Sequence, residues 1–170
     1  MNQAQDLLNM WGPNDLEEVE LFLYNMFSDK NIRPTNPMTR ALVRKIIITK
    51  RLDEAKESYA HLGGKSPLSA LTQKLIDSLK TKLDMAIYAA MRYVPPFATE
   101  SLMKCKEEGI EELLLFPLYP QYSTTTTLSS YEDIVARCKA LDYHPKITLL
   151  ACQYYDDIDY IQANVAQIEK

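Results

Sequence analysis

Aromatic, cationic and thioether side chains follow the short apolar runs of this sequence, at the points where buried strands are expected to end. Met10 follows the first such run, Arg92 the second and Tyr119 the third. Lys50 and Arg51 stand together on a stretch with helical periodicity. Apolar and aromatic walls edged by a few cations suit a large, flat, apolar ligand that carries acidic groups. The residues therefore predict an aromatic cleft that tolerates anions.

Each of these residues also has a plainer interpretation. Arg92 can pair with a carboxylate at the surface, and Lys50 and Arg51 can form a solvated helix face. Met26 and Phe27 lie on the apolar stripe of a predicted helix, where such residues more often belong to the core. The residues alone leave both interpretations open.

Motifs for hydrolytic, nucleotide or metal chemistry are missing from the sequence. It contains no HExxH, P-loop, GxGxxG or GxSxG pattern. The two histidines lie far apart, and we expect His61 at a helix end and His144 in a surface turn. Three separated cysteines without a CxxC pair predict reduced thiols in a cytoplasmic protein, rather than disulfides or a zinc site.

Length and composition are those of an ordinary globular chain. The sequence has 170 residues, of which 46% are apolar and 25% are charged, enough for one domain with its own core. The formal net charge of −4 argues against a nucleic-acid partner, which would need a basic surface. No apolar run approaches the roughly 20 residues of a membrane span. The first residues also lack the basic and apolar regions of a signal peptide.

Strand-like and helix-like segments alternate along the chain. Short apolar runs predict buried strands at residues 6–10, 86–91, 112–116 and 146–152. Helices are predicted after Asn14, over residues 39–61, from Ser66, between Pro96 and Gly109, and over residues 129–141 and 156–169. This alternation predicts an α/β fold with a parallel sheet of about four strands, flanked by helices on both faces. In such sheets ligands bind beyond the carboxyl ends of the strands.

Boundary residues and periodicity make two further local predictions. Asn14 followed by Glu17 is typical of a capping box at a helix start. Ser66 and Pro67 are typical of the N-cap and first position of the helix that follows. The buried stripe of that helix is predicted to consist of leucines at helical spacing, namely Leu68, Leu71, Leu75 and Leu79.

Five phrases, in order along the chain, resemble the ferrochelatase family. Residues 8–14 (LNMWGPN) resemble the family's LNMGGPN opening, and residues 16–29 continue it. Residues 59–67 (YAHLGGKSP) are similar to its Y-x-x-I-G-G-x-S-P segment, and residues 92–96 (RYVPP) to its R-Y-x-x-P motif. Residues 117–130 (PLYPQYSTTTTLSS) resemble its L-Y-P-Q-Y-S…T-T-x-S-S segment.

The resemblance implies a fold and an activity. Ferrochelatases insert Fe²⁺ into protoporphyrin IX, or coproporphyrin in some bacteria, to make haem. They use two similar three-layer, Rossmann-like or flavodoxin-like lobes that hold the porphyrin between them. Residues 1–170 would then form a single N-terminal lobe, with Fe²⁺ as substrate and no permanently bound cofactor. No [2Fe–2S] cluster is expected, since Thr124 stands where the animal enzymes have a cluster cysteine.

The same resemblance assigns roles to individual residues. The lip that holds the macrocycle would be lined by Met10, Met26, Phe27 and Ile32. The propionates or the cleft entrance would be met by Lys50, Arg51, Tyr59 and Ser66. The inner face, near the approach of the metal, would carry Arg92 and Tyr119, both in supporting roles.

Two departures from the family pattern matter for function. Trp11 replaces the first glycine of the GG pair, so it would either extend the lip or block part of the cleft. The S-x-H-x-x-P segment that carries the family's metal-inserting histidine is not in this sequence. We therefore expect the chain alone to be inactive and to need a C-terminal lobe as partner. The alternatives are a non-catalytic porphyrin-binding module and a single-lobe chelatase acting as a homodimer, and peripheral membrane contact also stays open.

Overall fold

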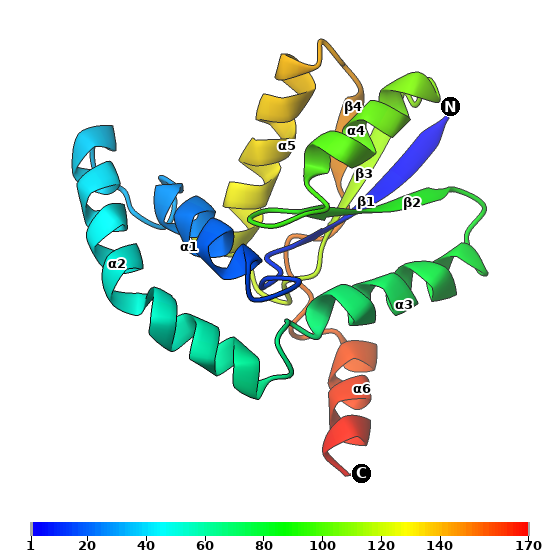
Figure 1. The fold of residues 1–170 in the computed structure, drawn as a ribbon. Coiled ribbons are helices and arrows are strands. Elements are labelled where there is room, and N and C mark those ends of the chain that lie inside the picture. Colours follow the sequence, from blue (N-terminus) through cyan, green and yellow to red (C-terminus); the bar gives the residue numbers. More distant parts are fainter. Residues whose placement is uncertain (1, 170) are drawn as a thin grey trace.

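A parallel sheet lies at the centre of the chain. The computed structural model describes residues 2–169, and Figure 1 shows their arrangement. The sheet has four strands in the order β2-β1-β3-β4, and every pairing is parallel. The strands are β1 (Gln3–Asn9), β2 (Ala86–Met91), β3 (Glu112–Pro117) and β4 (Lys146–Leu149). The predicted α/β fold with a parallel sheet is confirmed.

Strand β1 occupies the middle of the sheet and is buried on both faces. Its Leu7 is paired with Ala89 of β2 and Phe116 of β3. Because side chains alternate along a strand, Ala4 and Leu8 pack into one apolar cluster and Leu7 into another. The strand begins three residues before its predicted start, and β4 ends three residues before its predicted end.

Helices cover both faces of the sheet, so the predicted three layers are confirmed. Helices α4 (Ala98–Glu107) and α5 (Ser129–Ala140) pack on one face, and α3 (Leu68–Lys80) packs on the other (Figure 1). A π-helical turn at Thr124–Leu128 leads into α5. Among residues 2–169, no helix combines the length and the apolarity that crossing a bilayer requires.

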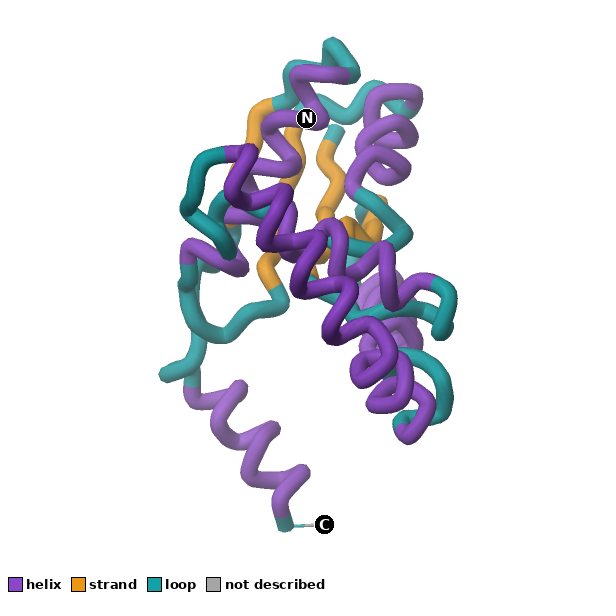
Figure 2. Tube along the Cα trace, turned by 60° about the vertical axis from the view of Figure 1, so that its left-hand side comes forward, coloured by secondary structure: helices purple, strands orange, loops and turns teal. Residues whose placement is uncertain are grey.

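Three other helices lie around the carboxyl ends of the strands. Helices α1 (Glu18–Ser28) and α2 (Pro37–His61) pack against each other. Figure 2 shows α2 as the longest rod and α6 (Ile158–Ile168) standing apart from the sheet. Asn36 caps α2 through the Thr39 amide, and Asp157 caps α6.

The predicted capping box at Asn14 is wrong. Helix α1 begins at Glu18, and the side chain of Asp15 accepts hydrogen bonds from the amides of Glu17 and Glu18, both at 2.9 Å. A carboxylate next to these free amides is the stronger acceptor, since it also carries the charge that a helix N-terminus favours. Asn14 instead donates to the Glu18 carboxylate.

The predicted leucine stripe of α3 is wrong at three of its four positions, since only Leu79 packs against the core. Leu68, Leu71 and Leu75 are exposed, and the helix buries Thr72 and Ile76 instead. Ile76 packs toward the sheet beside Ile87 of β2. The Thr72 hydroxyl accepts a hydrogen bond from the indole nitrogen of Trp11 at 3.1 Å, which requires this face of α3 to turn inward.

Candidate functional site

A cleft of about 430 Å³ lies between α1 and α2. Leu23, Met26 and Phe27 of α1 form one wall. The other wall comes from the second half of α2 and the residue after it, through Arg51, Glu54, Ala55, Ser58, Tyr59 and Leu62. Four residues that the sequence assigned to one ligand, Met26, Phe27, Arg51 and Tyr59, therefore lie around the same cleft.

The polar groups of this cleft lie among apolar walls. The Arg51 side chain is exposed, and its Nε is 3.5 Å from the Glu54 carboxylate. Burial raises the pKa of the Tyr59 hydroxyl, so this group stays protonated at neutral pH and can donate a hydrogen bond. Ser58 and Glu54 are the other polar residues of the lining. Apolar walls with a guanidinium and hydroxyl donors can hold a flat apolar molecule that carries a carboxylate.

The loop after β1 touches the Tyr59 side of the cleft. A Cβ atom on Gly12 would lie 2.6 Å from the Tyr59 hydroxyl and 3.1 Å from the Ser66 Cβ. Glycine is required there by this close approach. Ser66 itself is buried: its amide donates to the Pro13 carbonyl at 2.9 Å, and its Oγ accepts from the Leu68 amide at 3.3 Å. The structure places the N-cap at Pro67 and the first residue of α3 at Leu68, one position later than predicted, although Ser66 supplies an acceptor for the Leu68 amide.

Trp11 neither extends the lip nor blocks the cleft. Its side chain is buried against Met91 and Val94, with Phe22 of α1 packed beside them. The hydrogen bond from its indole nitrogen to Thr72 satisfies the single polar atom of the ring. The tryptophan therefore joins the loop after β1 to α3 and to the end of β2.

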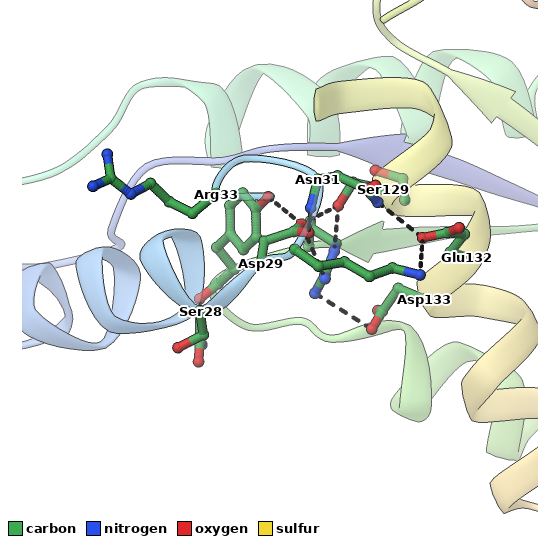
Figure 3. Close-up of polar contacts among 12 residues, drawn as sticks. Ser28, Asp29, Asn31, Arg33, Ser129, Glu132 and Asp133 are labelled. Carbon is green, nitrogen blue, oxygen red and sulfur yellow. Dashed lines mark hydrogen bonds and ion pairs between the residues drawn. The ribbon is translucent and has the colours of Figure 1, made fainter. Parts of the chain in front are cut away.

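A second, polar pocket of about 350 Å³ lies where β2 ends, between the α1–α2 loop and the start of α5. Figure 3 shows acidic and hydroxyl side chains from these elements converging. The pocket lining includes Asp29, Lys30, Arg92, Ser129, Glu132 and Asp133.

Each nitrogen of the Arg92 guanidinium meets an acceptor from the protein. Nε donates to Ser129 Oγ at 2.9 Å and Nη2 to Asp29 Oδ2 at 3.1 Å, while Nη1 lies 3.4 Å from Asp133 Oδ1. The side chain is only 19% exposed. The plainer interpretation of Arg92 is thus partly correct: it pairs with carboxylates, but in a largely buried pocket rather than at the surface.

Asp29 is the acceptor at the centre of this pocket, and sequence reasoning missed it. Its carboxylate accepts from the Tyr93 hydroxyl at 2.7 Å, from the Asn31 amide at 2.8 Å and from Ser129. Burial by itself would raise the pKa of Asp29. The hydrogen bonds from Ser129, Asn31 and Tyr93 and the charge of Arg92 outweigh it, so the pKa lies below its usual value. Two signals were available in the sequence: Asp29 directly follows the apolar stripe of α1, and it ends the family-like phrase of residues 16–29.

Tyr119 reaches the same end of α5 from the loop after β3. Its hydroxyl shares a 3.1 Å hydrogen bond with Ser130, the residue after the Arg92 partner Ser129. Burial raises the pKa of Tyr119 well above its ordinary value, so the phenol is neutral. Arg92 and Tyr119, both predicted to lie on the inner face, are thus hydrogen-bonded to two consecutive serines at the start of α5.

The remaining predicted site residues do not line either pocket. Met10 follows β1 and its amide is held by the Asn9 side chain at 2.8 Å. Ile32 is half-buried in the α1–α2 loop, and Lys50 is exposed on α2. Within residues 2–169, no three His, Cys, Asp or Glu side chains form a group that could hold a metal.

Comparison with known proteins supports the sequence resemblance. The family model named Ferrochelatase matches residues 6–170. A ferrochelatase of Nitratiruptor sp. is 48% identical over 166 residues, which is 96% of this chain and 53% of that protein. A ferrochelatase of Wolinella succinogenes is 44% identical over 99% of this chain and 54% of its own length. The chain thus spans about half the length of the curated relatives it matches.

Proposed function

The chain belongs to the ferrochelatase family, and from that premise we propose that it forms the porphyrin-holding N-terminal lobe of an enzyme that inserts Fe²⁺ into protoporphyrin IX. One observation carries this proposal. Met26, Phe27, Arg51 and Tyr59, separated by up to 33 residues, line one cleft between α1 and α2. The lobe acts together with the half of the enzyme that its relatives have and this chain does not span.

The cleft residues bind and orient the substrate. Met26 and Phe27 contact the apolar face of the macrocycle, since burying such surface is favourable in water. Arg51 and the protonated Tyr59 hydroxyl bind a propionate through charge-assisted hydrogen bonds. Arg92 and Tyr119 occupy the inner face, near the approach of the metal.

Removal of the two pyrrole protons needs a base. The two histidines of this chain are exposed and paired with nearby acids, His61 with Glu57 at 3.9 Å and His144 with Asp142 at 2.9 Å. Neither lines the cleft or the polar pocket. We therefore assign the base to the C-terminal half, and the lobe alone binds porphyrin without inserting metal.

Residues 37–52 of α2 support a peripheral contact with an anionic membrane surface. Residues 37–52 carry five Lys or Arg side chains and no acid. Met38, Leu42 and Ile46, spaced four residues apart, are exposed on the same helix. A basic amphipathic helix of this kind lies at lipid interfaces. Such a contact is compatible with a cytoplasmic location, which the free cysteines also support.

Porphyrin titration of the chain tests the proposal. We expect Phe27→Ala to weaken protoporphyrin binding about tenfold or more, because it removes one apolar wall. Arg51→Ala should weaken binding several-fold, whereas Lys45→Ala, which removes an exposed cation of the same helix outside the cleft, should have little effect. Equal affinity in the wild type and in Phe27→Ala, or no binding by the wild type, would reject the assignment of the cleft.

An anaerobic assay with Fe²⁺ tests whether this lobe binds porphyrin without inserting the metal. We expect the porphyrin fluorescence of the complex to persist, because no base is provided. Loss of fluorescence with formation of haem by the chain alone would show that it is complete. Sedimentation of the same sample would then distinguish a monomer from the single-lobe homodimer.

A further inference from the structure

One carboxylate connects the polar pocket with the apolar cleft. Asp29 follows α1, and its amide donates to the carbonyl of Met26, a cleft residue, at 3.3 Å. Its side chain is 2% exposed and contacts Arg92, Tyr93 and Ser129. Figure 3 shows Asp29 beside Ser129. The end of α1, the end of β2 and the start of α5 are therefore joined at one group.

We propose that Asp29 is a positioning residue, which fixes the orientation of Arg92 and the last turn of α1 and thereby the geometry of the porphyrin site. The inference rests on the proposed function of the cleft. It adds a role for a residue that touches neither the cleft nor the porphyrin.

The other carboxylates of the pocket cannot take this role. Asp133 is shared, since its Oδ2 accepts from Arg137 at 2.7 Å and its Oδ1 is 3.4 Å from Arg92. Glu132 is more exposed and binds Lys30 at 3.1 Å. Only Asp29, within the described chain, receives donors from the end of β2, the start of α5 and its own loop.

Loss of the Asp29 charge should release Arg92 toward α5. Asp133 would remain as its only carboxylate partner among the described residues, and Asp133 belongs to α5. The Tyr93 hydroxyl and Ser129 would lose their shared acceptor at the same time. The guanidinium would turn away from the α1–α2 loop. That loop would then lose its side-chain contacts from Asp29 to Arg92 and Tyr93, which follow β2.

Two readouts test the proposal in Asp29→Asn, with Glu132→Gln as a matched change of a carboxylate in the same pocket that does not touch Arg92. The first is the side-chain Nε–H signal of Arg92 in a ¹H–¹⁵N spectrum, assigned by its loss in Arg92→Lys. We expect this signal to shift or to exchange rapidly in Asp29→Asn and to stay in place in Glu132→Gln. An unchanged signal in Asp29→Asn would overturn the positioning role, whatever the porphyrin result.

The second readout is protoporphyrin affinity in a double-mutant cycle. We expect Asp29→Asn and Arg92→Ala each to weaken binding about tenfold, and the double variant to bind no more weakly than Arg92→Ala alone. Fully additive losses would overturn the proposal while the proposed function stands. Failure of the wild type to bind would reject the proposed function, and with it the link between Asp29 and a porphyrin site.

A conservative variant covers the case in which Asp29→Asn does not fold. Asp29→Glu keeps the charge but moves the carboxylate by one methylene, so the chain should fold with a displaced Arg92 signal and an intermediate affinity. A native Arg92 signal and native affinity in Asp29→Glu would contradict a requirement for the position of this group.

Discussion

Asp6 and Asp29 are both buried carboxylates, but they differ in the number of hydrogen-bond donors around them. Asp6 lies in the middle of β1, on the face that also carries Ala4 and Leu8, and one of its oxygens has no hydrogen-bond partner in the described chain. Its other oxygen accepts only from Ser101, at 3.2 Å. Asp29 is surrounded by donors from three elements.

The difference shows that partners, rather than burial, decide whether a buried acid is charged. Burial raises the pKa of Asp6 from 3.8 to about 7, and the Ser101 hydrogen bond offsets only part of this. The pKa of Asp29 is lowered despite its burial, because its donors and Arg92 favour the ionised form. Asp29 thus acts as a fixed negative charge, whereas Asp6 is largely neutral below about pH 6 and about half ionised at pH 7.

Removing Asp29 should have the largest effect on stability. Asp29→Ala leaves Arg92, Tyr93 and Ser129 without their shared acceptor, and breaking a buried pair of this kind costs about 3–5 kcal/mol. Urea unfolding followed by circular dichroism measures the loss. Because the folded pKa of Asp29 is lowered, its contribution is present above about pH 4 and is lost as the pH falls further. A loss that is independent of pH would contradict the assignment of a charged Asp29.

Removing Asp6 should raise the free energy of unfolding, whereas removing Asp29 lowers it. Asp6→Val replaces a poorly satisfied acid by a strand-forming apolar side chain, and we expect a gain of about 1–4 kcal/mol above pH 7. In the wild type, Asp6 lowers the free energy of unfolding by about 1.4 kcal/mol per pH unit between about pH 4 and about pH 7. Over this range the unfolded chain ionises and the folded chain does not. Urea unfolding across this range should show a flatter profile for Asp6→Val, and an unchanged slope would rule out a neutral Asp6.

Deleting single donors sharpens the comparison further. Ser101→Ala should raise the pKa of Asp6 and lower stability by about 1 kcal/mol above pH 7, since it removes the one donor that the described chain gives this carboxylate. Ser129→Ala is the counterpart at Asp29, which keeps Tyr93, Asn31 and Arg92. We therefore expect Ser129→Ala to shift the pKa of Asp29 by less than Ser101→Ala shifts the pKa of Asp6. Both shifts can be measured from the pH dependence of the free energy of unfolding. Equal shifts would mean that the Asp29 donors are not redundant.

The smallest effect is expected at an exposed acid beside the same pocket. Glu132→Gln removes an ion pair with Lys30 whose two side chains are well exposed, so stability should change by less than about 0.5 kcal/mol. Thermal unfolding at low and high salt checks this expectation. A loss near that of Asp29→Ala would show that the whole pocket, rather than Asp29, carries the stabilisation.

The architecture could be predicted from the sequence because local signals and topology agree. Apolar runs of strand length separated by helical periodicity leave few arrangements other than a covered parallel sheet. The orientation of α3 could not be predicted in this way. Its leucines have ideal helical spacing, but a hydrogen bond from Trp11, 61 residues away, places Thr72 on the inner face. The start of α1 could not be placed either, because Asn14 and Asp15 are both good capping residues and the helix begins only at Glu18.

The candidate site could be predicted only where the family-like motif residues lie on helices that pack against each other. Met26, Phe27, Arg51 and Tyr59 lie on two helices that pack together, so their convergence follows from the fold. Asp29 could not be found from its neighbours in the sequence, because its partners Arg92 and Ser129 are 63 and 100 residues away. The roles of Met10, Ile32 and Lys50 stay predictions.

The indole of Trp11 gives this lobe an optical probe of its own. It is the single tryptophan of the chain and is held in an apolar setting next to Gly12, whose backbone reaches Tyr59 at the cleft. Excitation at the long-wavelength edge of the indole band, where the eleven tyrosines do not absorb, therefore reports on one known position. The emission should be blue-shifted as long as the core around Trp11 is intact. Tetrapyrroles absorb in the range where indoles emit, so a porphyrin in the cleft should quench this emission by energy transfer. Occupancy of the lobe can then be followed in real time without a label.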